Sequence, residues 1–138
     1  MSESITALLV PVDGSEGSAR GARYAAELAK LAGASVTLLH ILPANDDDDF
    51  DAAEDLLDAR RGPFAVACDA MGWSIDEVEH RVAYGEPVSA ILRSAREAGA
   101  DLIVLGSRGL TPDEDGWTGS VSRRILNQAA CPVLVIPN

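Results

Sequence analysis

Short apolar runs alternate with segments of helical periodicity along the whole chain, and this alternation limits the possible folds more than any other feature. The apolar runs cover residues 5–12, 35–42, 78–84, 102–105 and 133–136. Between the first two, the alanines at 22, 25, 26 and 29 follow the i, i+3, i+4, i+7 spacing of a buried helix face. Strands that alternate with helices predict a parallel sheet with helices on both of its faces.

The strand order follows from where the chain makes its sharpest turns. Asp13-Gly14 follows the first run and Gly106-Ser107 follows the fourth. Ligands of such sheets bind beyond the carboxyl ends of the strands, where the winding reverses, and right-handed crossovers leave few orders to consider. We therefore predict one domain over residues 1–138, an open, Rossmann-like five-stranded parallel sheet in the order 3-2-1-4-5. One cleft would then contain both turns.

Two helical segments need comment. Residues 45–72 begin with an acidic stretch that we interpret as a loop, followed by a helix that Gly62-Pro63 interrupts. The last helix ends before Pro132, and its apolar positions, which we expect to be buried, are Val121, Ile125, Leu126 and Ala129.

The glycines after the fourth run form a spaced set. Gly106 and Gly109 are separated by two residues, and nine more residues precede Gly119-Ser120 at the start of the last helix. Glycine lets a ligand approach bare backbone, and the N–H groups of a turn and of a helix N-terminus attract anions. The spacing, placed between a strand and a helix, predicts a polyphosphate site.

Other residues near this cleft have less specific signals. Asp13 would accept hydrogen bonds from ribose hydroxyls or hold Mg²⁺ through water, and either Asp13 or Ser15 would cap the next helix. Ile41 would pack on a base, whereas His40 is better explained as a structural histidine. Arg108 would reach a phosphate or remain in solvent, and Trp117 would cover the ligand.

The net charge of −11 argues against nucleic acid or an anionic membrane as a direct partner. No apolar stretch approaches the roughly 18 residues of a membrane span, and the N-terminus does not resemble a signal peptide. Cys68 and Cys131 have no metal-binding or redox spacing. We expect a cytoplasmic protein with reduced cysteines.

The charged residues are unusual in kind, because ten of the eleven basic residues are arginine and only Lys30 is lysine. An acidic, lysine-poor surface resembles that of proteins from salt-loving organisms. The run 46–49 is most simply a solvated part of this surface. The acidic residues at 113–115 would repel a triphosphate in dilute buffer, and salt would screen them.

Several segments together resemble the universal stress protein family: VPVDGS at 10–15, LLHIL at 38–42, DLIVLGSRG at 101–109, Gly-Ser at 119–120 and ACPVLVIP at 130–137. The glycine set is similar to the motif G-2x-G-9x-G-[S/T] of its nucleotide-binding branch. The resemblance implies adenine against Val12 and Ile41 and ribose near Asp13 and Gly106. It implies phosphates at Gly109, Gly119, Ser120 and Val121.

The hypothesis that follows is a cytoplasmic stress-response regulator that binds ATP, or AMP or ADP, with Mg²⁺, and acts on an unknown protein partner. Two alternatives remain open: a nucleotide-free dimerisation module with a vestigial cleft, and a weak ATPase or phosphotransferase. Since no P-loop lysine or evident base is present, hydrolysis would be slow. Under every hypothesis we expect a homodimer that pairs through the edge strand Val133, Leu134, Val135 and Ile136.

Overall fold

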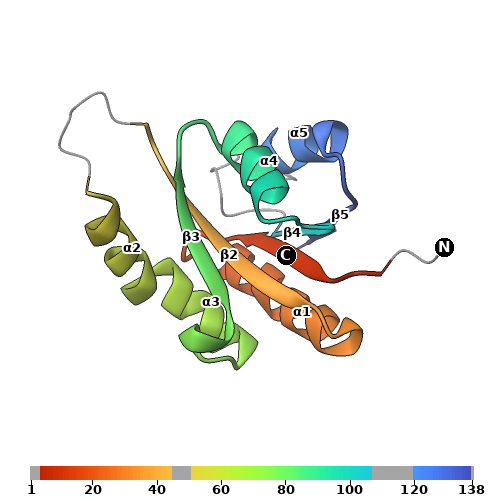
Figure 1. Cartoon of the computed structure of the whole chain (residues 1–138), viewed down its shortest axis with the longest axis horizontal. Helices are drawn as coiled ribbons and strands as arrows, with labels where there is room; N and C mark the ends of the chain where they lie inside the picture. Colours follow the sequence, from red (N-terminus) through yellow and green to blue (C-terminus); the bar gives the residue numbers. More distant parts are fainter. Residues whose placement is uncertain (1–3, 45–50, 107–119, 138) are drawn as a thin grey trace.

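The computed structural model describes residues 4–44, 51–106 and 120–137 (Figure 1). Their strands form one parallel sheet in the order β3-β2-β1-β4-β5, which confirms the predicted fold. The strands are β1 (Ala7–Pro11), β2 (Ser35–Leu42), β3 (Glu79–Tyr84), β4 (Leu102–Gly106) and β5 (Val133–Ile136).

Helices cover both faces of this sheet, as Figure 1 shows. Alternate residues of β1 point to opposite faces, so that Leu8 and Val10 pack in one core cluster and Leu9 in the other. The first cluster contains residues of α1 (Glu16–Ala32), α2 (Ala52–Arg61) and α3 (Pro63–Met71). The second contains residues of α4 (Pro87–Glu97) and α5 (Ser120–Gln128). A short 3₁₀ helix, η1 (Ile75–Glu77), precedes β3.

The predicted helix break lies at Gly62, between α2 and α3. The Gly62 N–H donates to the carbonyl groups of Asp58 and Ala59, which closes α2. Pro63 then occupies the first turn of α3, where its missing N–H leaves no intrahelical bond unmade. The two helices are therefore separate elements on one face of the sheet.

One expectation for the last helix is wrong. Val121 and Ile125 are buried, but the side chain of Leu126 is 51% exposed. The structure packs α5 at the end of the sheet against β5, an edge strand, and against α4. A helix at a sheet edge has a narrower buried face, and Leu126 lies outside it.

Tyr84, the last residue of β3, connects the sheet to α2. Its hydroxyl donates to Asp55 Oδ2 over 2.8 Å, and burial together with this bond raises the pKa of Tyr84 to about 12. We expect Tyr84→Phe to lower the free energy of unfolding by about 1 kcal/mol, because Asp55 loses this donor. Chemical denaturation at neutral pH measures the change, and an unaltered midpoint would show that the bond contributes nothing.

Asp101, just before β4, ties that strand to the start of β1. It accepts hydrogen bonds from the Thr6 N–H and hydroxyl and from the Ala7 N–H. Burial acts to raise the pKa of Asp101, but these hydrogen bonds outweigh it and hold that pKa below its usual value.

A lowered pKa in the folded state gives a definite pH dependence. The stabilisation by Asp101 is complete above its unfolded-state pKa, near 3.8, and is lost as pH falls through the lower folded-state value. We expect Asp101→Ala to lower the free energy of unfolding by about 1–2 kcal/mol at pH 7 and by less below pH ~3. Denaturant unfolding of both proteins across this range checks the prediction, which a pH-independent difference would contradict.

Candidate functional site

The predicted cleft lies where β1 and β4 end side by side. The two strands are parallel neighbours, with Leu8 opposite Leu102 and Leu9 opposite Ile103. Asp13 and Gly106, which come at the ends of these strands, therefore lie at the same edge of the sheet. After β1 the chain enters α1 on one face, and the helix that follows β4, α5, lies on the other. The winding reverses between these strands, which is where ligands bind in such sheets.

Helix α1 comes unusually close to the end of β4. A Cβ atom placed on Gly21 would lie 3.0 Å from the Gly106 nitrogen and 3.4 Å from the Leu105 carbonyl carbon. Gly21 is buried, and Ala22 and Ala25 beside it are small. The backbone of α1 therefore packs closely against the backbone of β4. Sequence analysis missed this contact, although a glycine within a helix is a signal that could have found it.

The Asp13 side chain is held by the turn into α1. Its Oδ1 atom accepts a hydrogen bond from the Ser15 N–H at 2.9 Å, and the backbone N–H of Asp13 donates to Ser18 Oγ at 3.1 Å. Ser15 is the N-cap and accepts from the Ser18 N–H. Ser15 therefore caps the helix, while Asp13 stabilises the turn, and its Oδ2 atom has no hydrogen bond to any other described residue.

His40 joins the ends of β1 and β2. A carbonyl oxygen only accepts, so the 3.0 Å contact between His40 Nδ1 and the Val12 oxygen places the proton on Nδ1. The ring also lies edge-on to Phe64, with centroids 6.4 Å apart. These contacts agree with a structural histidine.

Val12 and Ile41 project from opposite faces of the sheet. The Val12 side chain is buried in the cluster that contains α1 and α3, and Ile41 packs against the cluster that contains α4 and α5. A base at this edge would therefore meet Ile41 through its side chain and Val12 mainly through its backbone. The sequence pattern did not reveal this difference.

Helix α5 begins at Ser120, so its first N–H groups have no partner within the helix. Val121 is buried in the core and fixes this first turn. One turn later, Arg124 donates to Glu86 Oε1 at 2.9 Å. Glu86 also caps α4, and the bond from the Val88 N–H, with Arg124 assisting, lowers the pKa of Glu86. The start of α5 is thus attached to the start of α4.

The remaining predicted residues are Arg108, Gly109 and Gly119, together with the loop residue Trp117, and they lie outside the described residues. Within the described ranges, no three His, Cys, Asp or Glu side chains gather in a group that could hold a metal ion. The helices described here are also too short or too polar to cross a membrane.

Comparison with known proteins gives one consistent family. The sequence matches the model of the Universal stress protein family over residues 5–137. It is 31% identical to a universal stress protein of Synechocystis, with 94% of this chain and 84% of the relative covered. It is 30% identical to one of Methanocaldococcus jannaschii, covering 94% and 80%.

Solved structures agree with this result. A universal stress protein in complex with cAMP superimposes with a TM-score of 0.75 at 27% identity, covering 97% of this chain and 98% of the other. One from Archaeoglobus fulgidus in complex with dAMP gives a TM-score of 0.66 at 28% identity, covering 96% and 97%.

Proposed function

The chain belongs to the universal stress protein family, and from this premise we propose that it binds an adenine nucleotide between the ends of β1 and β4. The observation that carries the proposal is the meeting of Asp13 and Gly106 at one sheet edge, where the winding reverses. The nucleotide complexes of two structural relatives, with cAMP and with dAMP, support the choice of an adenine nucleotide.

In this proposal the chain's own groups have separate tasks. Asp13 Oδ2 accepts from a ribose hydroxyl, and Ile41 packs on the base. The N–H groups at the start of α5, at Ser120 and Val121, bind the phosphates together with Gly109, Gly119 and Arg108. The physiological ligand would be ATP, or AMP or ADP, with Mg²⁺ held through water by Asp13.

We further propose that the nucleotide regulates the protein and is at most slowly hydrolysed, in a cytoplasmic stress response. Hydrolysis needs a base that orients water at the terminal phosphate. Among the described residues, His40 is the one histidine near the cleft. Its ring packs against Phe64 on the face of α1 and α3, whereas α5, whose N–H groups would bind the phosphates, lies on the other face. This arrangement favours binding over catalysis.

Calorimetric titration with ATP and with AMP tests the proposal, with Mg²⁺ present and in both dilute and molar salt. We expect saturable binding that is tighter in salt, because screening weakens repulsion by the acidic residues at 113–115 and by the net charge of −11. Absence of binding in both buffers, with no nucleotide released from denatured protein, would leave the vestigial-cleft alternative.

We also propose a homodimer that pairs through β5. This strand is an edge of the sheet, Leu134 on it is 36% exposed, and Val133 and Val135 are half-buried. An apolar edge strand with unpaired backbone groups favours pairing with another strand. Sedimentation velocity at micromolar concentration should give a dimer, and a monomer in molar salt would contradict the proposal.

A further inference from the structure

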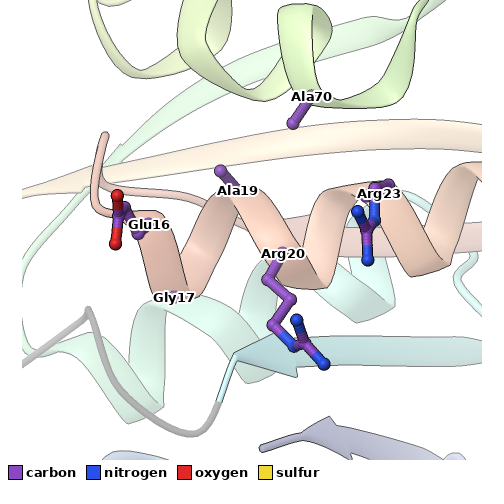
Figure 2. A pocket seen from close by; sticks show the side chains of 6 residues that line it. All are labelled: Glu16, Gly17, Ala19, Arg20, Arg23 and Ala70. Atoms are coloured by element: carbon purple, nitrogen blue, oxygen red, sulfur yellow. The ribbon is translucent and has the colours of Figure 1, made fainter. Parts of the chain in front are cut away.

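A second surface lies along α1, between α3 and the end of β5, where Arg20 contacts Pro137. An open groove of about 640 Å³ is lined by Glu16, Gly17, Ala19, Arg20, Arg23 and Ala70. Figure 2 shows both arginines on α1 and Ala70 on the neighbouring α3. We call this surface, with Tyr24, the α1 groove. Neither Asp13 nor Gly106 is among the described residues that line the groove.

Both arginines are arranged around one aromatic ring. The guanidinium carbons of Arg20 and Arg23 lie 5.6 and 5.7 Å from the centroid of Tyr24, within the range of a cation–π contact. Arg20 has a second contact that fixes its side chain, because its Nε donates a hydrogen bond to the Pro137 carbonyl oxygen at 2.9 Å. Its terminal Nη groups have no hydrogen-bond partner among the described residues, and a guanidinium binds a carboxylate through two parallel hydrogen bonds.

These cations have no carboxylate partner among the described residues. The ion pairs found there are Arg81–Glu97 and Arg124–Glu86. The whole chain has 22 acidic residues and 11 basic ones. Because carboxylates are in excess, an arginine without a carboxylate partner is unexpected. Two such arginines at one ring outnumber Glu16, the one carboxylate among the described residues that line the groove, and leave a small local excess of positive charge on an acidic protein.

The same side of α1 also exposes apolar side chains. Tyr24 is 40% exposed and Leu31 is 85% exposed. Positions 20, 24 and 31 lie on one side of the helix, since each is separated from the previous one by whole turns. Lys30, the only lysine of the chain, is exposed beside Leu31. The surface thus offers positive charge at one end and a large aliphatic side chain at the other.

We propose that the α1 groove binds an acidic peptide segment of a protein partner. Its carboxylates pair with Arg20 and Arg23, one apolar residue packs on Tyr24, and a second packs on Leu31, about 10 Å farther along the helix. Charge complementarity selects this occupant, because the described residues that line the groove include two guanidinium groups and one carboxylate, that of Glu16. The net charge of −11 opposes the approach of an acidic peptide at long range, so binding depends on these local contacts.

Fluorescence anisotropy with a labelled peptide of Glu-Glu-Leu repeats tests the proposal in about 0.1 M salt, where screening is moderate. We expect saturable binding that weakens at least about tenfold in the variant with both Arg20→Ala and Arg23→Ala, equivalent to about 1.4 kcal/mol. Tyr24→Phe keeps the ring and should bind like the wild type, whereas Tyr24→Ala should bind weakly.

Matched controls separate this site from nonspecific effects. Arg96→Ala removes an exposed arginine from α4, on the other face of the sheet, and should leave the affinity unchanged. A peptide of Gln-Gln-Leu repeats should not bind. Thermal unfolding and nucleotide titration of each variant report on the fold and on the cleft separately.

Several outcomes would overturn the proposal. These are no binding by the wild type, equal binding by the double variant, and equal weakening by Arg96→Ala. Displacement of the peptide by an equal concentration of inorganic phosphate would indicate a general anion site. A dimer in sedimentation that the double variant loses would assign the surface to a second copy of the chain.

Discussion

The Gly21→Val variant is expected to lose about 3 kcal/mol of stability, the larger of the two main effects that we predict. The added side chain would enter space that ends 3.0 Å from a backbone nitrogen of β4, and backbone moves less readily than a flexible side chain. Overpacking of this kind destabilises proteins by about 1–3 kcal/mol or somewhat more. Guanidinium unfolding at 25 °C measures the loss.

The alanine variant gives the sharper comparison. In an ordinary helix Gly→Ala stabilises by about 1 kcal/mol, because alanine loses less backbone entropy. We expect Gly21→Ala to destabilise instead, by about 1 kcal/mol, because the methyl group meets Gly106. Ala32→Val, which adds a β-branched side chain at an exposed position of the same helix, should change stability by no more than about 0.7 kcal/mol. A stabilised Gly21→Ala variant would show that α1 and β4 are not in tight contact.

Substitution of Asp13 is expected to have the largest effect on nucleotide affinity. In the proposed complex Asp13 Oδ2 accepts a hydrogen bond from a ribose hydroxyl, and Asp13→Ala removes this bond to a charged group, which contributes about 1.5–3 kcal/mol. The dissociation constant for ATP or AMP should therefore rise about 10- to 100-fold. Isothermal calorimetry in molar salt gives the constant directly.

Asparagine at position 13 separates the two tasks of this side chain. An amide oxygen still accepts from the Ser15 N–H, so Asp13→Asn should keep the turn and the stability of the wild type. Its affinity should fall between those of the wild type and Asp13→Ala. If all three proteins bind nucleotide equally, Asp13 only shapes the turn.

Much of the fold could be predicted because strong local signals agreed with one another. Pro63 and Pro87 lie in the first turns of helices, Gly33 ends α1 with a φ of 71°, and β2 covers the residues expected of it. The strand order followed from the turns at Asp13 and Gly106 combined with general rules of handedness.

What could not be predicted depends on contacts between distant segments. The close approach of Gly21 to Gly106, the tie between His40 and Val12, and the opposite orientations of Val12 and Ile41 each join different elements. Helical periodicity also overestimated burial at Leu126, because a sequence pattern does not show how far the sheet extends beneath a helix.

The Glu86–Arg124 pair is an ion pair that links the two helices on one face of the sheet. It joins the first turn of α4 to α5, while α1 is packed by its bare backbone on the opposite layer. Because both side chains of this pair are about half-exposed, it adds at most about 1 kcal/mol, whereas the contact of α1 with β4 is made by backbone that moves little. The two faces of the sheet are therefore fastened by bonds of very different strength.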